Sequence, residues 1–116
     1  MKISYAILTH NEGEYIEKLL KFLVENKREE DEIVIVDDYS KDKKTVSTFT
    51  KFKENIQLYF REFDGDATQK NYLNTKCTGD YILQLDADEI FKKEFIKLLP
   101  ALLENNKETD LFYVPR

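Results

Sequence analysis

The stretch Gly79-Asp80-Tyr81-Ile82-Leu83-Gln84-Leu85-Asp86-Ala87-Asp88-Glu89 runs an apolar segment directly into three acids that are interrupted by one alanine. The part from Tyr81 to Leu85 is rich in strand-forming side chains, so we expect a strand that places Asp86 and Asp88 at its carboxyl end. Open α/β sheets bind their ligands at that edge. Two neighbouring carboxylates repel one another unless a cation, a lysine or a proton intervenes, and their hard oxygen atoms suit Mg²⁺ or Mn²⁺ with a bound diphosphate. This Asp-X-Asp pattern therefore indicates a metal site, although acids are equally favoured as caps of the helix expected from Phe91.

The remainder of the chain alternates between strand and helix patterns. Apolar runs predict strands over residues 3–9, 32–36, 56–60 and 81–85, with another beginning at 111–114. Helical spacing predicts helices over residues 14–25, 45–53, 67–76 and 91–105, the last interrupted or kinked at Pro100. This alternation is typical of an α/β fold with mostly parallel strands and helices on both faces of the sheet. No linker or repeat divides residues 1–116, so we expect a single domain.

Composition narrows the class of protein. The 116 residues are 41% hydrophobic and 35% charged, which is ordinary for a globular domain. A formal net charge of -5 argues against nucleic acid as the main partner, because phosphate binding needs a basic face. Cys77 is the only cysteine, so we expect a small packed residue in a reducing compartment. No signal peptide or membrane span is recognised, and a cytoplasmic protein with at most peripheral membrane contact is expected.

Polar groups follow three of the predicted strands. Thr9 and Asn11 come after the first strand, Asp37 and Asp38 after the second, and Asp86 after the strand quoted above. The carboxyl ends of parallel strands share one edge, so these groups would meet where a nucleotide needs hydrogen-bond acceptors and cations.

Each of these groups also has a structural interpretation. Thr9 or Asn11 would cap the following helix, and Asp37 and Asp38 would cap the next turn through Ser40. His10, the sole histidine, is left without an assigned role.

The chain has few means of binding phosphate through its backbone. It contains only 3 glycines, so neither a dinucleotide fingerprint nor a P-loop can be written on it. A diphosphate would instead be neutralised by a divalent ion on Asp86 and Asp88, with help from a basic side chain such as Lys70. Spacing alone equally allows Lys70 to be an ordinary surface lysine.

Four segments in order carry a resemblance to a known family. They are Thr9-His10-Asn11-Glu12, the run from Glu32 to Asp42, Gln69-Lys70-Asn71, and the run from Thr78 to Glu89. Together they resemble the donor half of a family 2 glycosyltransferase with the Rossmann-like GT-A fold. Residues 61–89 are especially similar to the bacterial subgroup that adds sugars to lipopolysaccharide cores.

The resemblance implies a site as well as an activity. Thr9 and Asn11 would lie beside the base and ribose, and Asp38, or else Asp37, would accept a hydrogen bond from the base. Lys70 would stand where the family usually has an arginine near the nucleotide. Asp86 would face the ribose and the metal, and Asp88 would be the direct ligand of Mn²⁺ or Mg²⁺.

The implied reaction is a hexosyl-type transfer. Such enzymes move a sugar from a nucleoside diphosphate sugar, here expected to be a UDP-sugar, to a hydroxyl of a saccharide or lipid-linked acceptor. The expected products are lipopolysaccharide or other cell-surface polysaccharide. The bound metal stabilises the departing diphosphate, and in inverting members a carboxylate deprotonates the acceptor.

That carboxylate is where the chain departs from the family, whose members continue well beyond the equivalent of Arg116. Glu89 and Asp110 are candidates by charge alone and match no family position, so the catalytic base is unknown. We therefore expect a C-terminally truncated GT-A domain whose exposed sheet edge favours self-association. A second interpretation is a non-catalytic module that binds nucleotide sugar and metal and acts with a partner chain. A third is an α/β interaction domain with a relict site.

Overall fold

Strands and helices alternate strictly along the protein in its computed structural model, which describes residues 1–88 and 93–105. The elements in order are β1 (Ile3–Thr9), α1 (Gly13–Asn26), β2 (Glu32–Asp37), α2 (Lys43–Lys51), β3 (Gln57–Phe60), α3 (Asp66–Lys76), β4 (Tyr81–Asp86) and α4 (Lys93–Asn105). The predicted α/β class is confirmed, and all eight elements lie close to the ranges expected from the sequence. The strand expected at residues 111–114 and the helix start near Phe91 lie outside the described residues.

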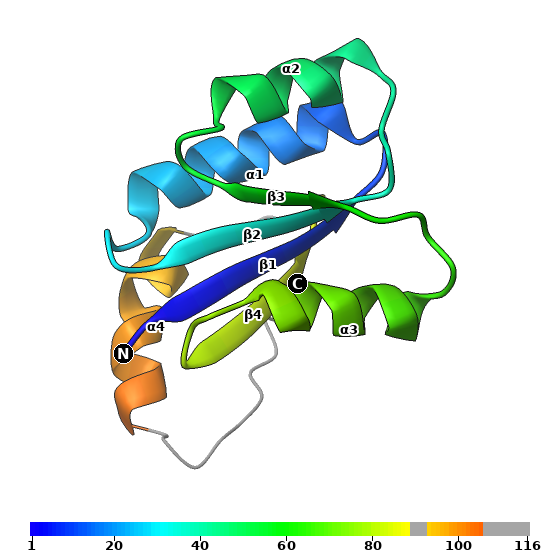
Figure 1. Ribbon diagram of the computed structural model, residues 1–116. Helices are drawn as coiled ribbons and strands as arrows, with labels where there is room; N and C mark the ends of the chain where they lie inside the picture. The colour runs from blue at the N-terminus through cyan, green and yellow to red at the C-terminus, as the bar shows by residue number, and fades with distance from the viewer. Residues whose placement is uncertain (89–92, 106–116) are drawn as a thin grey trace.

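The four described strands form one sheet in the order β3-β2-β1-β4, and every neighbouring pair is parallel (Figure 1). The central strand β1 brings distant parts of the chain into register. Leu8 lies opposite Val36 of β2 on one side and Asp86 of β4 on the other. The carboxyl ends of β1, β2 and β4 therefore meet at one edge of the sheet.

Helices cover both faces of the sheet, as predicted. Alternate residues of β1, such as Tyr5 and Ile7, pack into a core with α1, α2 and α4. Ala6, between them, faces the other side and packs in a smaller cluster with Leu73 of α3. This division follows from the period of two in a strand, which sends successive side chains to opposite faces.

Two helices differ from expectation. Helix α2 begins at Lys43 rather than Thr45 because the carboxylate of Asp42 accepts hydrogen bonds from the N–H and hydroxyl of Thr45, at 3.1 and 2.6 Å. The sequence predicted either an interruption or a kink at Pro100; helix α4 continues through this residue, so the interruption is wrong. Leu99 and Leu103 of α4 are buried in the core, and this packing offsets the backbone hydrogen bond that a proline removes.

Among residues 1–88 and 93–105, no helix has both the length and the apolar character needed to cross a bilayer.

Candidate functional site

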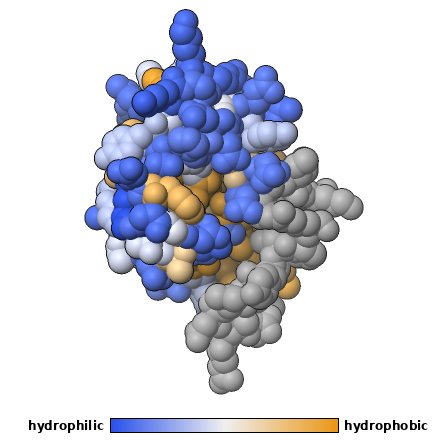
Figure 2. Space-filling view, turned by 90° about the vertical axis from the view of Figure 1, so that its right-hand side faces the viewer, coloured by the Kyte–Doolittle hydropathy of each residue, from blue (hydrophilic) through white to orange (hydrophobic). Residues whose placement is uncertain are grey.

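A pocket of about 480 Å³ opens at the carboxyl edge of the sheet, within the size range of small-molecule sites. It lies where the chain topology reverses, because β2 and β3 extend the sheet on one side of β1 and β4 on the other. Its lining residues come from the ends of β1, β2 and β4, the β3–α3 loop and the first turns of α3, and they are Leu8, Thr9, His10, Glu12, Asp38, Phe63, Asp66, Gln69, Lys70 and Asp86. Figure 2 looks onto this edge and shows apolar surface at the centre, bordered by hydrophilic residues.

Asp38 lies on the pocket, whereas Asp37 does not. The side chain of Asp37 is fully buried, and its two oxygens accept hydrogen bonds from the N–H and hydroxyl of Ser40, at 2.7 and 2.6 Å. The carboxylate of Asp38 accepts one hydrogen bond from the N–H of Phe63 at 3.1 Å. Asp37 therefore takes the structural role of capping the turn through Ser40, and Asp38 keeps acceptor capacity at the pocket.

Thr9 supplies a buried polar group to the pocket wall. The residue is only 5% exposed, and its hydroxyl has no hydrogen-bond partner among the described residues. Its backbone carbonyl accepts a hydrogen bond from the N–H of Asp38 at 3.1 Å, which fixes the end of β1 against the end of β2. Buried hydroxyls are normally paired, so the Thr9 hydroxyl is suited to bind a ligand or water.

Asn11 does not line the pocket. Its side chain connects the loop after β1 to the loop after β2. The residue has a left-handed φ of 50°, and its side-chain oxygen accepts hydrogen bonds from the N–H groups of Lys41 and Asp42, at 2.8 and 3.3 Å. Helix α1 has Glu12 as its N-cap residue, with no side-chain capping bond, so the expectation that Thr9 or Asn11 caps this helix is wrong.

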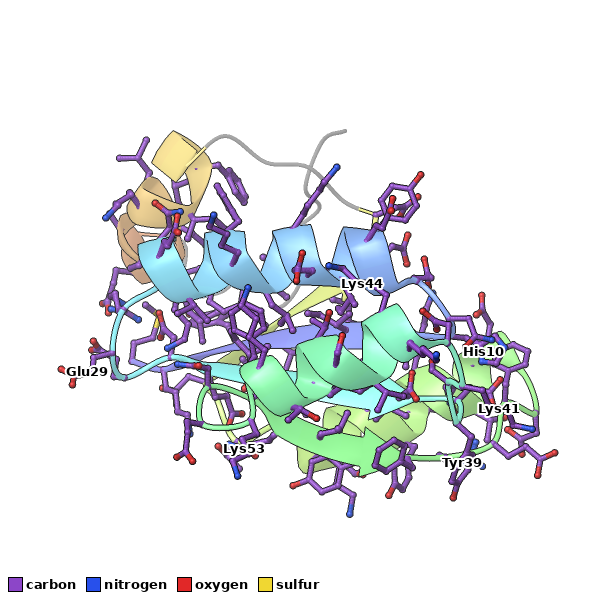
Figure 3. The ribbon with its side chains drawn as sticks, turned by 90° about the horizontal axis from the view of Figure 1, so that it is seen from above. His10, Glu29, Tyr39, Lys41, Lys44 and Lys53 are labelled. Atoms are coloured by element: carbon purple, nitrogen blue, oxygen red, sulfur yellow. The ribbon has the colours of Figure 1, made fainter. Side chains whose placement is uncertain are left out.

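His10 belongs to the loop between β1 and α1 and lines the pocket, where its ring contacts the residue that follows β2. Its Nδ1 atom is 2.7 Å from the backbone oxygen of Asp38 and 3.5 Å from the Asp38 carboxylate. Figure 3 shows His10 at the same end of the molecule as Tyr39 and Lys41, with Glu29 at the opposite end. The ring therefore adds a polar group beside Asp38, which the sequence left unassigned.

Lys70 brings a positive charge to the pocket from α3. Its ammonium group is 4.0 Å from the carboxylate of Asp66, one turn earlier in the helix, and both side chains are largely exposed. Such an exposed pair contributes little to stability. The ammonium group therefore remains available to a ligand anion.

Asp86 is the last residue of β4 and lines the pocket, whereas Asp88 comes two residues later and is not among the lining residues; both are exposed. Both carboxylates influence the nearby Glu12. Partial burial is the main cause that raises the pKa of Glu12 above its ordinary value; a hydrogen bond from the His10 N–H lowers it, and the charges of Asp88 and Asp86 raise it further. Within residues 1–88 and 93–105, no cluster of three or more acidic, histidine or cysteine side chains is arranged to hold a metal. A cation at Asp86 and Asp88 would therefore need further oxygen ligands from water or from a bound phosphate.

Six pocket residues had no predicted role, and they are Leu8, His10, Glu12, Phe63, Asp66 and Gln69. Glu12 and Gln69 were recognised from the sequence only as parts of motifs. Phe63 is 52% exposed, and a large exposed aromatic side chain is typical of a binding surface. This exposure is apparent only from the fold and not from the sequence. Cys77, by contrast, is partly buried against the smaller core cluster, as predicted. This burial, and then the charge of Glu32, raises the pKa of its thiol to about 11.

Solved structures of known proteins are similar to this fold. The crystal structure of Staphylococcus aureus TarS in complex with UDP-GlcNAc has a TM-score of 0.76 at 27% identity, over 92% of this chain and 32% of that one. The mannosyltransferase PcManGT from Pyrobaculum calidifontis, in complex with GDP-Man and Mn²⁺, has a TM-score of 0.72 at 25% identity, over 87% of this chain and 32% of that one. Both are GT-A glycosyltransferases, so the predicted fold class is confirmed.

Sequence comparison gives the family. The model described as Glycosyl transferase family 2 matches residues 4–115, and the chain belongs to this family. Poly(ribitol-phosphate) beta-N-acetylglucosaminyltransferase TarS of Staphylococcus aureus is 28% identical over 112 residues, which cover 91% of this chain and 19% of TarS. Poly-beta-1,6-N-acetyl-D-glucosamine synthase of the same species is 33% identical over 95 residues, which cover 79% of this chain and 23% of the synthase. The chain thus spans about a fifth of the length of these two relatives.

Proposed function

We propose that this chain is the donor-binding part of a glycosyltransferase that takes its sugar from a nucleoside diphosphate sugar, with UDP as the nucleotide. One observation carries the proposal: the pocket gathers Thr9, Asp38, Lys70 and Asp86 from four separate elements at the edge where such sheets bind ligands. The two structural relatives named above were solved with UDP-GlcNAc and with GDP-Man, which supports this class of ligand.

The residues divide by the chemistry of the ligand. The carboxylate of Asp38 accepts a hydrogen bond from the base, and the hydroxyl of Thr9 lies beside the base or ribose. The ammonium group of Lys70 pairs with the diphosphate. Asn11 acts on the nucleotide only indirectly, by connecting the loops that follow β1 and β2. Asp37, whose two oxygens bond to Ser40, is the weaker candidate for the base contact.

A divalent cation fits the acidic end of the pocket. Asp86 and Asp88 offer hard oxygen donors. Burial is the main reason that the pKa of Glu12 is raised, and the charges of Asp88 and Asp86 raise it further, which supports an acidic environment at this end of the pocket. Asp86 and Asp88 would hold Mn²⁺ or Mg²⁺. The ion would supply positive charge to the departing diphosphate.

The proposal for the whole reaction is a metal-dependent, inverting transfer to a hydroxyl of a saccharide or lipid-linked acceptor. The catalytic base has no assigned residue, and Glu89 and Asp110 lie outside the described residues. A cytoplasmic location is proposed because the single cysteine is unpaired.

The alternative function is a non-catalytic module that acts with a partner chain. Such a module would bind the same donor without turning it over.

Calorimetric titration tests the proposal directly. We expect UDP to bind, to bind more tightly with Mn²⁺ than with EDTA, and to bind better than CDP or ADP. Failure of all nucleoside diphosphates to bind would overturn the proposal. Release of UDP from UDP-sugars then separates the enzyme from the non-catalytic module.

A further inference from the structure

The side chain of Gln69 is committed to a single partner, although it lies in the pocket wall. Gln69 is 2% exposed and belongs to α3. Its amide nitrogen donates to the backbone oxygen of Arg61 at 2.9 Å, and its amide oxygen accepts from the Arg61 guanidinium at 2.9 Å. This reciprocal pairing fixes the amide orientation and joins the end of β3 to α3.

Arg61 extends the same arrangement in two further directions. Its guanidinium makes two hydrogen bonds to the carboxylate of Asp64, at 2.8 and 3.2 Å. Its backbone N–H donates to the backbone oxygen of Asp37 at 3.0 Å. Arg61 is therefore held to β2 through its backbone and to α3 through Gln69, and its guanidinium also bonds to Asp64 within residues 61–64.

Phe63 lies within this segment and contacts the proposed base-binding residue. Its N–H donates to one carboxylate oxygen of Asp38 at 3.1 Å. A hydrogen bond to a charged acceptor is stronger than a neutral one, so the position of Phe63 restrains the Asp38 carboxylate. The carboxylate retains further acceptor sites for a ligand.

We infer that Arg61 and Gln69 are positioning residues that orient Asp38 toward the base and thereby set the choice of nucleotide, an inference that depends on the proposed function. A carboxylate can accept a hydrogen bond from N3–H of uracil, whereas N3 of cytosine has no hydrogen. Cytosine offers only its 4-amino group as a donor, so displacing Asp38 from the N3 position weakens UDP binding more than CDP binding.

A second arginine–aspartate pair provides a matched control. Arg28 makes two hydrogen bonds to Asp31, at 3.0 and 2.9 Å, and a third to the backbone oxygen of Met1 at 3.0 Å. This pair does not line the pocket. Arg28→Lys and Arg61→Lys each keep the positive charge but remove the bidentate hydrogen bonding to an aspartate. The two variants therefore lose comparable hydrogen bonds.

The experiment measures UDP and CDP affinity by calorimetry with Mn²⁺, and thermal stability, for the wild type and for Arg61→Lys, Gln69→Leu, Gln69→Glu and Arg28→Lys. In metal sites, removing a residue that orients a ligating side chain lowers affinity by about tenfold or more. By analogy, we expect Arg61→Lys and Gln69→Leu each to lower UDP affinity by about tenfold. Gln69→Glu still accepts from Arg61 and should retain most of the UDP preference. Arg28→Lys should lower thermal stability without changing the preference.

Three outcomes would overturn this inference. An unchanged UDP preference in both Arg61→Lys and Gln69→Leu is one, and an equal loss of UDP and CDP affinity, which marks a purely structural role, is another. A change of preference in Arg28→Lys as large as in Arg61→Lys is the third. If the wild type binds neither nucleotide, the proposed function itself fails, so the two failures are distinguishable.

Discussion

Asp37 and Asp38 are neighbours in sequence, yet their carboxylates serve different surroundings. That of Asp37 is fully buried and bonded to Ser40, and that of Asp38 faces the pocket with one hydrogen bond from Phe63. The backbone at the end of β2 turns one acid inward to hold the following loop and leaves the next at the site. Substitutions at the two positions should therefore affect different properties.

Asp38→Ala should weaken UDP binding by about 1.5 to 3 kcal/mol, because a hydrogen bond to a charged acceptor is lost. The thermal stability should change little, since the Asp38 side chain is partly exposed. Calorimetry with Mn²⁺ measures the first and thermal denaturation the second. Wild-type affinity in this variant would move the base contact to another residue.

Asp37→Ala should lower the free energy of unfolding by about 3 kcal/mol, because the partly buried N–H and hydroxyl of Ser40 lose their acceptors. Urea denaturation measures this change, with Asp38→Ala as the neighbouring control. An unfolding free energy equal to that of the wild type would show that the Asp37–Ser40 bonds do not hold the loop.

Asp88→Ala should abolish the increase in UDP affinity that Mn²⁺ produces, because the variant lacks one of the two proposed ligands. The fold should persist, since Asp88 is exposed. Glu29→Ala is a matched control, because Glu29 is also exposed and lies at the other end of the molecule (Figure 3). Equal Mn²⁺ dependence in Asp88→Ala and the wild type would contradict the metal assignment.

Glu32 should make stability depend on acid. Burial alone would raise its pKa, but hydrogen bonds from Ser4, from the N–H and hydroxyl of Thr78, and from Lys2 outweigh burial and lower the pKa to about 2. Because the folded pKa is depressed, this stabilisation is complete above the unfolded value of 4.5 and is lost as the pH falls toward 2. Each pKa unit corresponds to about 1.4 kcal/mol, so lowering the pKa from 4.5 to about 2 contributes about 3 kcal/mol to the free energy of unfolding, and acid removes this contribution.

Urea denaturation between pH 5 and pH 2 tests this expectation, and the Glu32→Gln variant should show a smaller decrease in stability over that range. Parallel decreases in the variant and the wild type would mean that other groups determine the acid sensitivity. Glu30→Gln, at an exposed position two residues earlier, controls for the removal of a charge.

Local patterns were enough to predict the elements, because strand alternation and helical spacing are properties of neighbouring residues. The early start of α2 depended on a capping bond from Asp42, and the continuity of α4 through Pro100 depended on core packing. Neither can be read from periodicity alone.

The site was predicted mainly at the strand ends, and Lys70 of α3 was added only as a basic side chain for the diphosphate. Asp38 and Asp86 lie at the pocket because parallel strands share an edge. The roles of Gln69 and Phe63 depend on bonds between the β3–α3 loop and its neighbours, and Asn11 bonds to backbone 30 residues away. Such partners are fixed by the tertiary fold and leave no signal in spacing.

The central position of β1 has a consequence for how the domain acquires its structure. β1 comes earliest of the four described strands, yet its partner on one side is β4, so that Ile3 pairs with Tyr81. During synthesis β1 can join β2 first, but its other edge must wait until β4 has emerged. Pairings over such long separations slow folding. The pocket, which needs both Thr9 and Asp86, would therefore be among the last features to form.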